Sequence, residues 1–127
     1  MGGSIDVERI GQIAVTVADV DRARAFYRDV LGLRHLFDAP PRMSFFDCGG
    51  VRLLLGERES SGAEHGTSIL YLYVADIRGA HGVLTQQGVT FEQAPHRVAD
   101  LGDRELWLAF FRDSEANMMA LMSEVPK

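Results

Sequence analysis

The sequence predicts an α+β fold: two tandem βαβββ units that form a half-open, curled mixed sheet with the helices outside. One observation is an internal repeat, in which Asp19 and Asp76 each follow a strand-like run and lie 57 residues apart. A second is that each aspartate precedes a helical pattern, and these patterns end at Gly32 and Gly88, 56 residues apart. A repeat of this length indicates two copies of one supersecondary unit, so equivalent positions can be compared between the copies.

In the first unit, residues 12–17 are predicted to form a strand with one apolar side toward the helix. Its other side is small and polar, which suits the wall of a cavity. Asp19 is expected to cap a helix that continues to Leu31 and ends at Gly32, a favourable residue just after a helix. The other strands of this unit are expected at residues 33–37, 42–47 and 51–55, with a turn at 48–50.

The second unit repeats this plan. Its first strand is predicted at residues 69–74, with alternate residues toward the helix and toward the cavity. Asp76 is expected to cap a helix in which Gly79 and Gly82 cost up to ~1 kcal/mol each relative to alanine, so packing has to hold that helix. Further extended segments are expected at residues 89–92, 96–99, 105–111 and 118–122.

A single domain is expected, because 127 residues and 14.0 kDa are enough to bury one core. We place this domain at residues 10–127, after an N-terminal extension at 1–9. The two units then span about 10–57 and 67–124, and the polar segment 58–66 links them.

Composition excludes several classes of partner. A net charge of −5 and an isoelectric point near 5.3 argue against nucleic acid or an anionic membrane surface. No apolar run approaches the ~20 residues that cross a bilayer, and the first residues lack the pattern of a signal peptide. The lone Cys48 excludes an internal disulfide and favours a reducing, cytoplasmic location.

Two stretches of the chain resemble the vicinal-oxygen-chelate superfamily, which includes glyoxalase I, bleomycin-resistance proteins, extradiol dioxygenases and methylmalonyl-CoA epimerase. Residues 13–19 and 25–32 resemble the first strand and the FYxxxLG helix signature of that family. Residues 110–117 resemble its final hairpin, usually written D-P-x-G-N, although Ser114 replaces the proline and Ala116 the glycine. The resemblance covers most of the chain and implies the same fold.

The resemblance also implies where a metal would bind, because enzymes of the family hold a divalent ion with His, Gln or Glu on the first and fourth strands of each unit. Carried over by position, these sites fall at Gln12, Leu53 (within about one residue), Ile69 and Ala120. Only Gln12 can donate an electron pair, whereas a catalytic site typically keeps three protein ligands. No cofactor is therefore predicted, and Gln12 is the one candidate metal ligand among these four inherited positions.

Three functions stay open at this point. The first is binding of a small apolar or aromatic molecule, similar to the bleomycin-resistance branch. The second is a divalent-metal-dependent lyase, isomerase or dioxygenase with an unusual ligand set such as Gln12, Glu57 and His96, to which His65 could add. The third is metal-free acid–base catalysis by His96 with Tyr71 or Tyr73, since the ordinary pKa of histidine suits proton transfer near neutrality.

A homodimer is expected, because half-open sheets leave strand edges and apolar area to cover. The sequence does not say whether each cleft lies within one chain or between two. Aromatic side chains favour an apolar or aromatic ligand. The residues predicted to line the cleft are Gln12, Ala14, Thr16, Leu53, Leu55, Ile69, Tyr71, Tyr73, His96, Trp107, Ala120 and Met122.

Overall fold

A computed structural model describes residues 5–6, 8–57 and 68–127 of the chain. The predicted order of elements, β-α-β-β-β twice, is confirmed. Module 1 contains β1 (Gln12–Val17), α1 (Val20–Ala25), the π-helix η1 (Phe26–Val30), β2 (Arg34–Ala39), β3 (Met43–Cys48) and β4 (Val51–Glu57). Module 2 contains β5 (Leu70–Tyr73), α2 (Ile77–Gln86), β6 (His96–Asp100), β7 (Arg104–Arg112) and β8 (Met118–Pro126).

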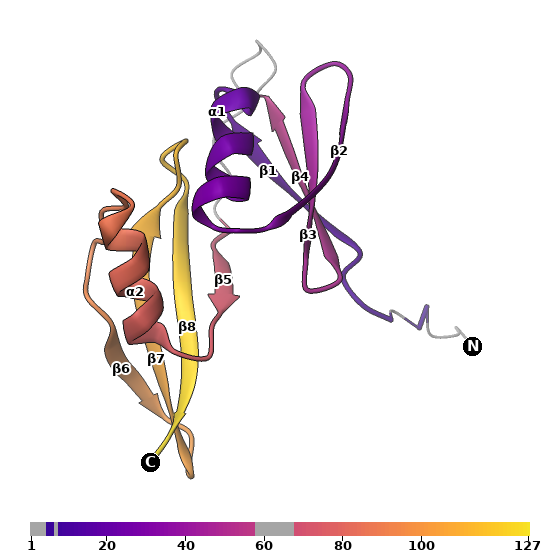
Figure 1. Ribbon diagram of the computed structural model, residues 1–127. Coiled ribbons are helices and arrows are strands. Elements are labelled where there is room, and N and C mark those ends of the chain that lie inside the picture. The colour runs from indigo at the N-terminus through magenta and orange to yellow at the C-terminus, as the bar shows by residue number, and fades with distance from the viewer. Residues whose placement is uncertain (1–4, 7, 58–67) are drawn as a thin grey trace.

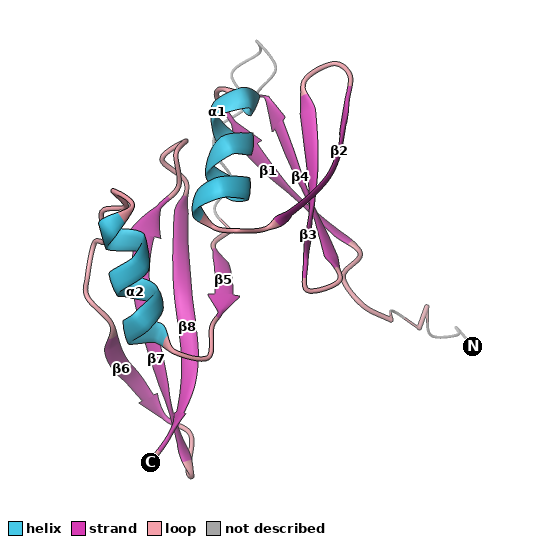
Figure 2. Ribbon diagram, in the orientation of Figure 1, coloured by secondary structure: helices cyan, strands magenta, loops and turns pink. Residues whose placement is uncertain are grey.

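Each module folds into its own four-stranded mixed sheet (Figures 1 and 2). Sheet 1 has the order β1-β4-β3-β2, and sheet 2 has the matching order β5-β8-β7-β6. In both sheets the first and last strands of the module are parallel and the other pairs are antiparallel. Neither sheet closes into a barrel, so the predicted α+β class with open sheets is confirmed.

The first helix differs from the prediction in its geometry. It begins after Asp19, whose side chain accepts a hydrogen bond from the Arg22 amide, as expected of a cap. From Phe26 onward it widens into one π-helical turn, in which the Leu31 amide donates to the Phe26 carbonyl at 3.0 Å. Gly32 then ends the helix with a φ of +74°, a conformation that glycine adopts without strain.

Two other local expectations have different outcomes. The predicted turn between β3 and β4 is confirmed at Gly49 and Gly50. Both glycines have a positive φ, which is the backbone conformation that a two-residue hairpin turn needs to match the twist of its strands. The extended segment expected at residues 89–92 is not a strand, since only Phe91 forms an isolated bridge with Phe111.

The helix-facing sides of the two sheets share one hydrophobic core. Tyr27 on the first helix lies at its centre with no exposed surface, and it contacts Phe46 of sheet 1 and Met119 of sheet 2. In Figure 1, α1 lies between sheet 1 and the β8 side of sheet 2. The helix therefore occupies the space between the modules, and the opposite faces of the sheets, which we call the outer faces, do not share this core.

The turn between β7 and β8 fastens the two modules together. The Glu115 carboxylate accepts hydrogen bonds from the amides of Ala18 and Asp19 at 3.0 and 2.9 Å, so it caps the N-terminus of α1 from the other module. The same carboxylate pairs with Arg22, whose Nε lies 2.7 Å from Oε2. Burial alone would raise the pKa of Glu115, but these hydrogen bonds and that of Ser114 lower it to about 2.

The remaining expectations on chain organisation fall largely outside the described residues, which include neither the linker 58–66 nor His65. None of the helices in the described ranges is long and apolar enough to span a membrane.

Candidate functional site

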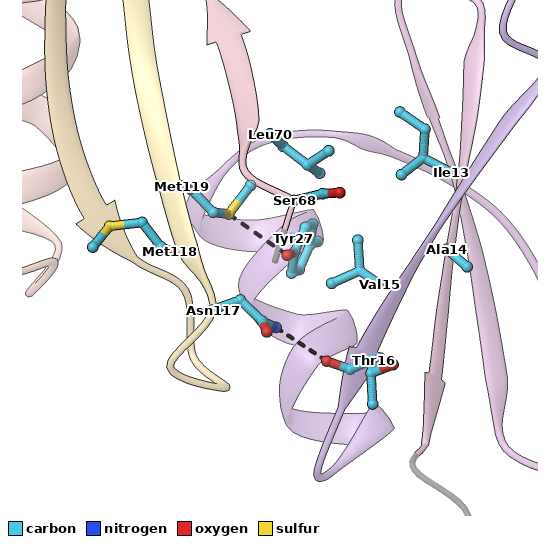
Figure 3. A pocket seen from close by; sticks show the side chains of 10 residues that line it. All are labelled: Ile13, Ala14, Val15, Thr16, Tyr27, Ser68, Leu70, Asn117, Met118 and Met119. Carbon is cyan, nitrogen blue, oxygen red and sulfur yellow. Dashed lines mark hydrogen bonds between the residues drawn. The ribbon is translucent and has the colours of Figure 1, made fainter. Parts of the chain in front are cut away.

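Strand register defines which residues share the outer face of sheet 1. Gln12 pairs with Arg52, Ala14 with Leu54 and Thr16 with Gly56 across the β1–β4 ladder. Side chains alternate between the two faces of a strand, so these six residues lie opposite the core residues between them. Figure 3 shows this alternation on β1, where Val15 is directed toward Tyr27 and Ala14 away from it.

The outer face of sheet 2 is defined in the same way. One row across the sheet is Tyr73, Met122, Leu108 and His96, and the next is Tyr71, Ala120 and Phe110. The rings of Tyr71 and Phe110 meet edge to face with their centroids 6.1 Å apart. Tyr71 and Tyr73 are 48% and 60% exposed, so this aromatic face is open to solvent in a single chain.

Each outer face contains one buried apolar residue that lies outside the common core. These residues are Phe45 in sheet 1 and Ala120 in sheet 2. Phe45 is covered by the stacked ring of Phe37, at a centroid distance of 4.5 Å, and by the Arg52 guanidinium, 5.7 Å from its centroid. Each outer face therefore contains ordered apolar side chains and is not a uniformly polar, solvent-exposed surface.

Three residues expected to line the cleft do not lie on these faces. Leu53 and Leu55 are 2% and 0% exposed and belong to the core, because β4 has the opposite parity to the one assumed. Trp107 packs against the core from the helix side, and Arg78 of α2 covers its ring at 4.9 Å. On β4, the residues that do face outward are Arg52, Leu54 and Gly56.

The other residues that were predicted to line the cleft are divided between the two outer faces. Gln12, Ala14 and Thr16 lie on sheet 1, whereas Tyr71, Tyr73, His96, Ala120 and Met122 lie on sheet 2. Ile69 immediately precedes β5 and is half-buried. The structure therefore gathers the predicted cleft into two separate walls and does not bring them together within one chain.

His96 is placed on the outer face but away from the tyrosines. The row from Tyr73 to His96 crosses three strand spacings, which corresponds to about 14 Å. Its Nδ1 lies 3.0 Å from the carbonyl of Ala94, and no described carboxylate pairs with its ring. A proton cannot pass directly between His96 and Tyr73 over this distance.

The positions implied for a metal can now be tested against register. Ala120 pairs with Tyr71 and Phe110 as Leu54 pairs with Ala14 and Phe45, so the structural equivalent of Ala120 is Leu54 and not Leu53. Leucine, isoleucine and alanine offer no donor atoms. Within the described ranges, no three His, Cys, Asp or Glu residues group to hold a metal.

Gln12 itself already has a partner. Its Oε1 accepts a hydrogen bond from Arg52 Nε at 2.8 Å, so a fixed positive charge lies beside the one available donor. A divalent cation there would meet electrostatic repulsion and would find a single neutral ligand. The described residues at these positions do not fit a divalent metal.

Glu57, the other residue considered as a ligand, has a structural role. Its Oε2 accepts hydrogen bonds from the Val20 amide at 2.9 Å and from Arg42 at 3.0 Å. The hydrogen bonds from Arg42 and then Val20 lower the pKa of this carboxyl. Glu57 therefore ends β4 and helps to cap α1.

A small cavity at the seam between the modules is too small for an organic ligand. It measures about 120 Å³, whereas ligand pockets usually measure ~300–1,000 Å³. Asn117 Nδ2 donates to the Thr16 carbonyl across it at 3.1 Å, as Figure 3 shows. Tyr27 donates to Asp113 at 2.7 Å, and burial, followed by the charge of Asp113, raises the pKa of this phenol.

A larger apolar groove lies beside β5. It measures about 430 Å³ and is formed by α2, β5 and the end of the first helix with Cys48. Burial, followed by the charge of Asp47, raises the pKa of the Cys48 thiol, so this cysteine is not an activated nucleophile. Because Tyr71 and Tyr73 also border the groove, apolar surface continues from the outer face of sheet 2 around the edge of β5.

Comparisons with known proteins agree with this architecture. Residues 9–121 match the model of the family described as Glyoxalase/Bleomycin resistance protein/Dioxygenase superfamily. The fold is similar to that of a lactoylglutathione lyase from Agrobacterium tumefaciens, with a TM-score of 0.74, 23% identity, and coverage of 93% of this chain and 95% of that one.

Two further solved structures show the same fold. A member of the glyoxalase/bleomycin resistance protein/dioxygenase superfamily from Sphaerobacter thermophilus has a TM-score of 0.75 and 25% identity, over 93% of this chain and 98% of that one. An integron cassette protein from V. cholerae has a TM-score of 0.77 and 19% identity, over 95% and 98%. Among curated proteins, none matches the chain.

Proposed function

Because the chain belongs to the Glyoxalase/Bleomycin resistance protein/Dioxygenase superfamily, we propose that it is a small-molecule-binding protein that works without a metal ion. Its ligand is an apolar or aromatic molecule held against the outer faces of the two sheets. The observation that carries the proposal is the chemistry at the four metal positions. Three of them are apolar, and at the fourth Arg52 occupies the Gln12 amide oxygen.

The aromatic side chains support binding of a flat, apolar ligand. Tyr71 and Phe110 form an edge-to-face pair on sheet 2, and Phe37 stacks on Phe45 on sheet 1. Rings of this kind provide large contact areas at a small entropic cost. Binding would therefore rest mainly on burial of apolar surface, with few polar contacts to orient the ligand.

The same proposal includes a homodimer whose clefts lie between the chains. The first helix lies between the two sheets, so the outer faces of one chain cannot cover each other. A two-fold axis would set sheet 1 of each copy opposite sheet 2 of the other and create two equivalent clefts. The exposed rings of Tyr71 and Tyr73 and the unpaired edge of β5 supply the apolar surface that such a contact would cover.

Titration with phenylnaphthylamine, an uncharged aromatic dye that fluoresces in apolar surroundings, tests the binding function. We expect saturable binding that EDTA does not change and that Tyr71→Ala weakens by about tenfold, because the variant loses a stacking wall. Failure of the wild-type protein to bind this dye would count against the proposed cleft. A stoichiometric metal that Gln12→Ala removes would favour the alternative of a metal-dependent lyase, isomerase or dioxygenase.

Light scattering during size-exclusion chromatography tests the dimer. The wild-type protein is expected to elute with twice the chain mass of 14.0 kDa. Tyr73→Glu places a charge in the proposed contact and should give a monomer. Leu101→Glu, an equally non-conservative change at an exposed apolar residue beyond β6, serves as the control and should leave the dimer intact.

We also place the protein in the reducing cytoplasm as part of this proposal. The chain has one cysteine, Cys48, and no pair that could form an internal disulfide. Fractionation of the native cell should recover the chain with cytoplasmic markers. Recovery with exported proteins would contradict this location.

A further inference from the structure

Arg52 is held in a defined position on the outer face of sheet 1. It stands in one register row between Gln12 on β1 and Asp47 on β3. Its Nε donates to Gln12 Oε1 at 2.8 Å, and its guanidinium carbon lies 5.7 Å from the centroid of the Phe45 ring. Phe45 is in turn fixed by its stack with Phe37. A neutral amide and an aromatic ring therefore orient the cation.

The charge of Arg52 is not neutralised by the described part of the chain. Arg22, Arg24, Arg42 and several other arginines pair with a carboxylate within 4.0 Å, whereas Arg52 forms no such pair. Asp47 is its direct partner across the β3–β4 ladder, yet the two side chains do not form an ion pair. Among the described residues only Nε finds an acceptor, so the two terminal nitrogens of the fork remain available to a bound anion.

The surroundings of Arg52 suit the apolar part of an anionic ligand. The next row of the same face presents Ala14, Leu54 and the aromatic pair around Phe45. Guanidinium is planar and weakly hydrated, and it binds carboxylate, sulfonate or phosphate oxygens in a bidentate manner. Because the chain carries a net charge of −5, general attraction cannot bring an anion to it, and a local cation is required.

We propose that the ligand is an organic anion with an aromatic or apolar body, and that Arg52 binds its acidic group while Gln12 holds the guanidinium in place. The inference rests on the proposed binding function and names the ligand class for the same cleft. In this arrangement a permanent side-chain cation attracts the ligand oxygens. It therefore supplies charge recognition on the face where relatives with a complete ligand set would use a metal.

Two dyes that share an aromatic body and differ in charge test this inference. Anilinonaphthalene sulfonate carries an acidic group, and phenylnaphthylamine is its uncharged counterpart. We expect Arg52→Gln to weaken binding of the sulfonate by about tenfold or more, as loss of a charge-assisted contact predicts, and to affect phenylnaphthylamine much less. Arg52→Lys should retain part of the preference, because it keeps the charge and loses the fork.

The controls separate charge recognition from folding and from general electrostatics. Arg28→Gln removes the same charge from an exposed arginine on the first helix that pairs with Asp29, and it should bind both dyes as the wild-type protein does. Circular dichroism and light scattering establish that the variants are folded and have the same oligomeric state. Added salt should weaken binding of the sulfonate and not of the neutral dye.

The outcomes distinguish this inference from the function on which it rests. Equal loss of both dyes in Arg52→Gln, or no loss of either, overturns the role of Arg52 in anion recognition and leaves the cleft in place. An equal effect of Arg28→Gln on the sulfonate overturns it as well, since the effect would then be one of net charge. Absence of binding of both dyes to the wild-type protein overturns the cleft itself.

Discussion

The two modules have the same strand order but carry different chemistry on their outer faces. Gln12 of module 1 corresponds to Ile69 of module 2, and Arg52 corresponds in register to Met118. One wall thus offers an amide and a guanidinium, whereas the other offers aromatic and aliphatic side chains. The inward positions of both modules are mainly apolar and form the common core, so the outward positions can differ without loss of the fold.

The helices differ in a parallel way. Asp19 and Asp76 cap their own helices alike, but among the described residues only α1 has further caps from outside its own segment, namely Glu57 and Glu115. The buried centre of the first helix is Tyr27, and the equivalent residue of α2 is Leu84. The first helix joins the modules, whereas α2 packs mainly on β7 and β8 of its own sheet. Module 1 is therefore expected to be the more sensitive to loss of single contacts.

The largest difference should appear when the central residue of each helix is truncated. Tyr27→Ala is expected to lower the free energy of unfolding by about 4 kcal/mol, because it leaves a cavity between both sheets and removes the hydrogen bond to Asp113. Leu84→Ala should cost about 2–3 kcal/mol. Urea denaturation followed by circular dichroism at one fixed protein concentration measures both values. A larger cost at Leu84 would reverse the comparison.

Removal of the caps should show a smaller difference in the same direction. Glu115→Ala is expected to cost about 2 kcal/mol, because the amides of Ala18 and Asp19, just before the helix, and the Arg22 side chain lose a buried acceptor. Asp76→Ala removes a single local cap and should cost about 1 kcal/mol. The same urea measurement applies. Equal losses of stability in the two variants would mean that Glu115, in the β7–β8 turn, stabilises α1 no more than a local cap does.

The dependence of stability on pH should reveal the same cap. Since the pKa of Glu115 is lowered to about 2 in the folded chain, the charged form stabilises the fold above its ordinary value near 4.5. This contribution is lost as the pH falls from about 4.5 toward 2. We expect Glu115→Gln to be less stable than the wild-type protein at pH 7, with the gap narrowing below pH 4.5. A gap that stays constant down to pH 2 would contradict the assignment.

The smallest effect concerns the two glycines of α2. A Cβ at Gly82 would meet no atom within 4 Å, so Gly82→Ala should stabilise the protein by about 0.5–1 kcal/mol. A Cβ at Gly79 would lie 2.5 Å from Oδ2 of Asp76, which is the cap of that helix. Gly79→Ala should therefore give no such gain. Melting temperatures of the two variants check this contrast, and equal gains would contradict it.

Much of the fold could be predicted because its signals are local. Alternating side chains on β1 and the two aspartate caps lie within single segments of sequence, and both are found as expected. The parity of β4 could not be read in the same way, since Leu53, Leu54 and Leu55 are all leucines and do not alternate in polarity. A one-residue error reverses the faces, which is why two core leucines were assigned to the cleft. Within the segment 51–55 predicted as this strand, Arg52 was the one polar residue.

Other features depend on contacts that no local pattern records. Glu57 and Glu115 accept hydrogen bonds at the start of the first helix from 37 and 96 residues away. From the neighbouring sequence alone, both glutamates would be taken for solvent-exposed turn residues. Trp107 lies between Leu106 and Leu108, so its face is equally ambiguous in sequence. The separation of the two outer faces depends on how α1 packs between the sheets. That packing is a property of the tertiary structure.

The cap that Glu115 provides also bears on the order in which the protein is made and folded. The Ala18 amide and its acceptor are 97 residues apart, so the first helix emerges from the ribosome long before its partner has been translated. Contacts of such high sequence separation slow folding, since the intervening chain must first be ordered. The nascent N-terminal half should therefore remain incompletely folded until the last hairpin is released. We expect the two halves, despite their internal repetition, to fold in one concerted step.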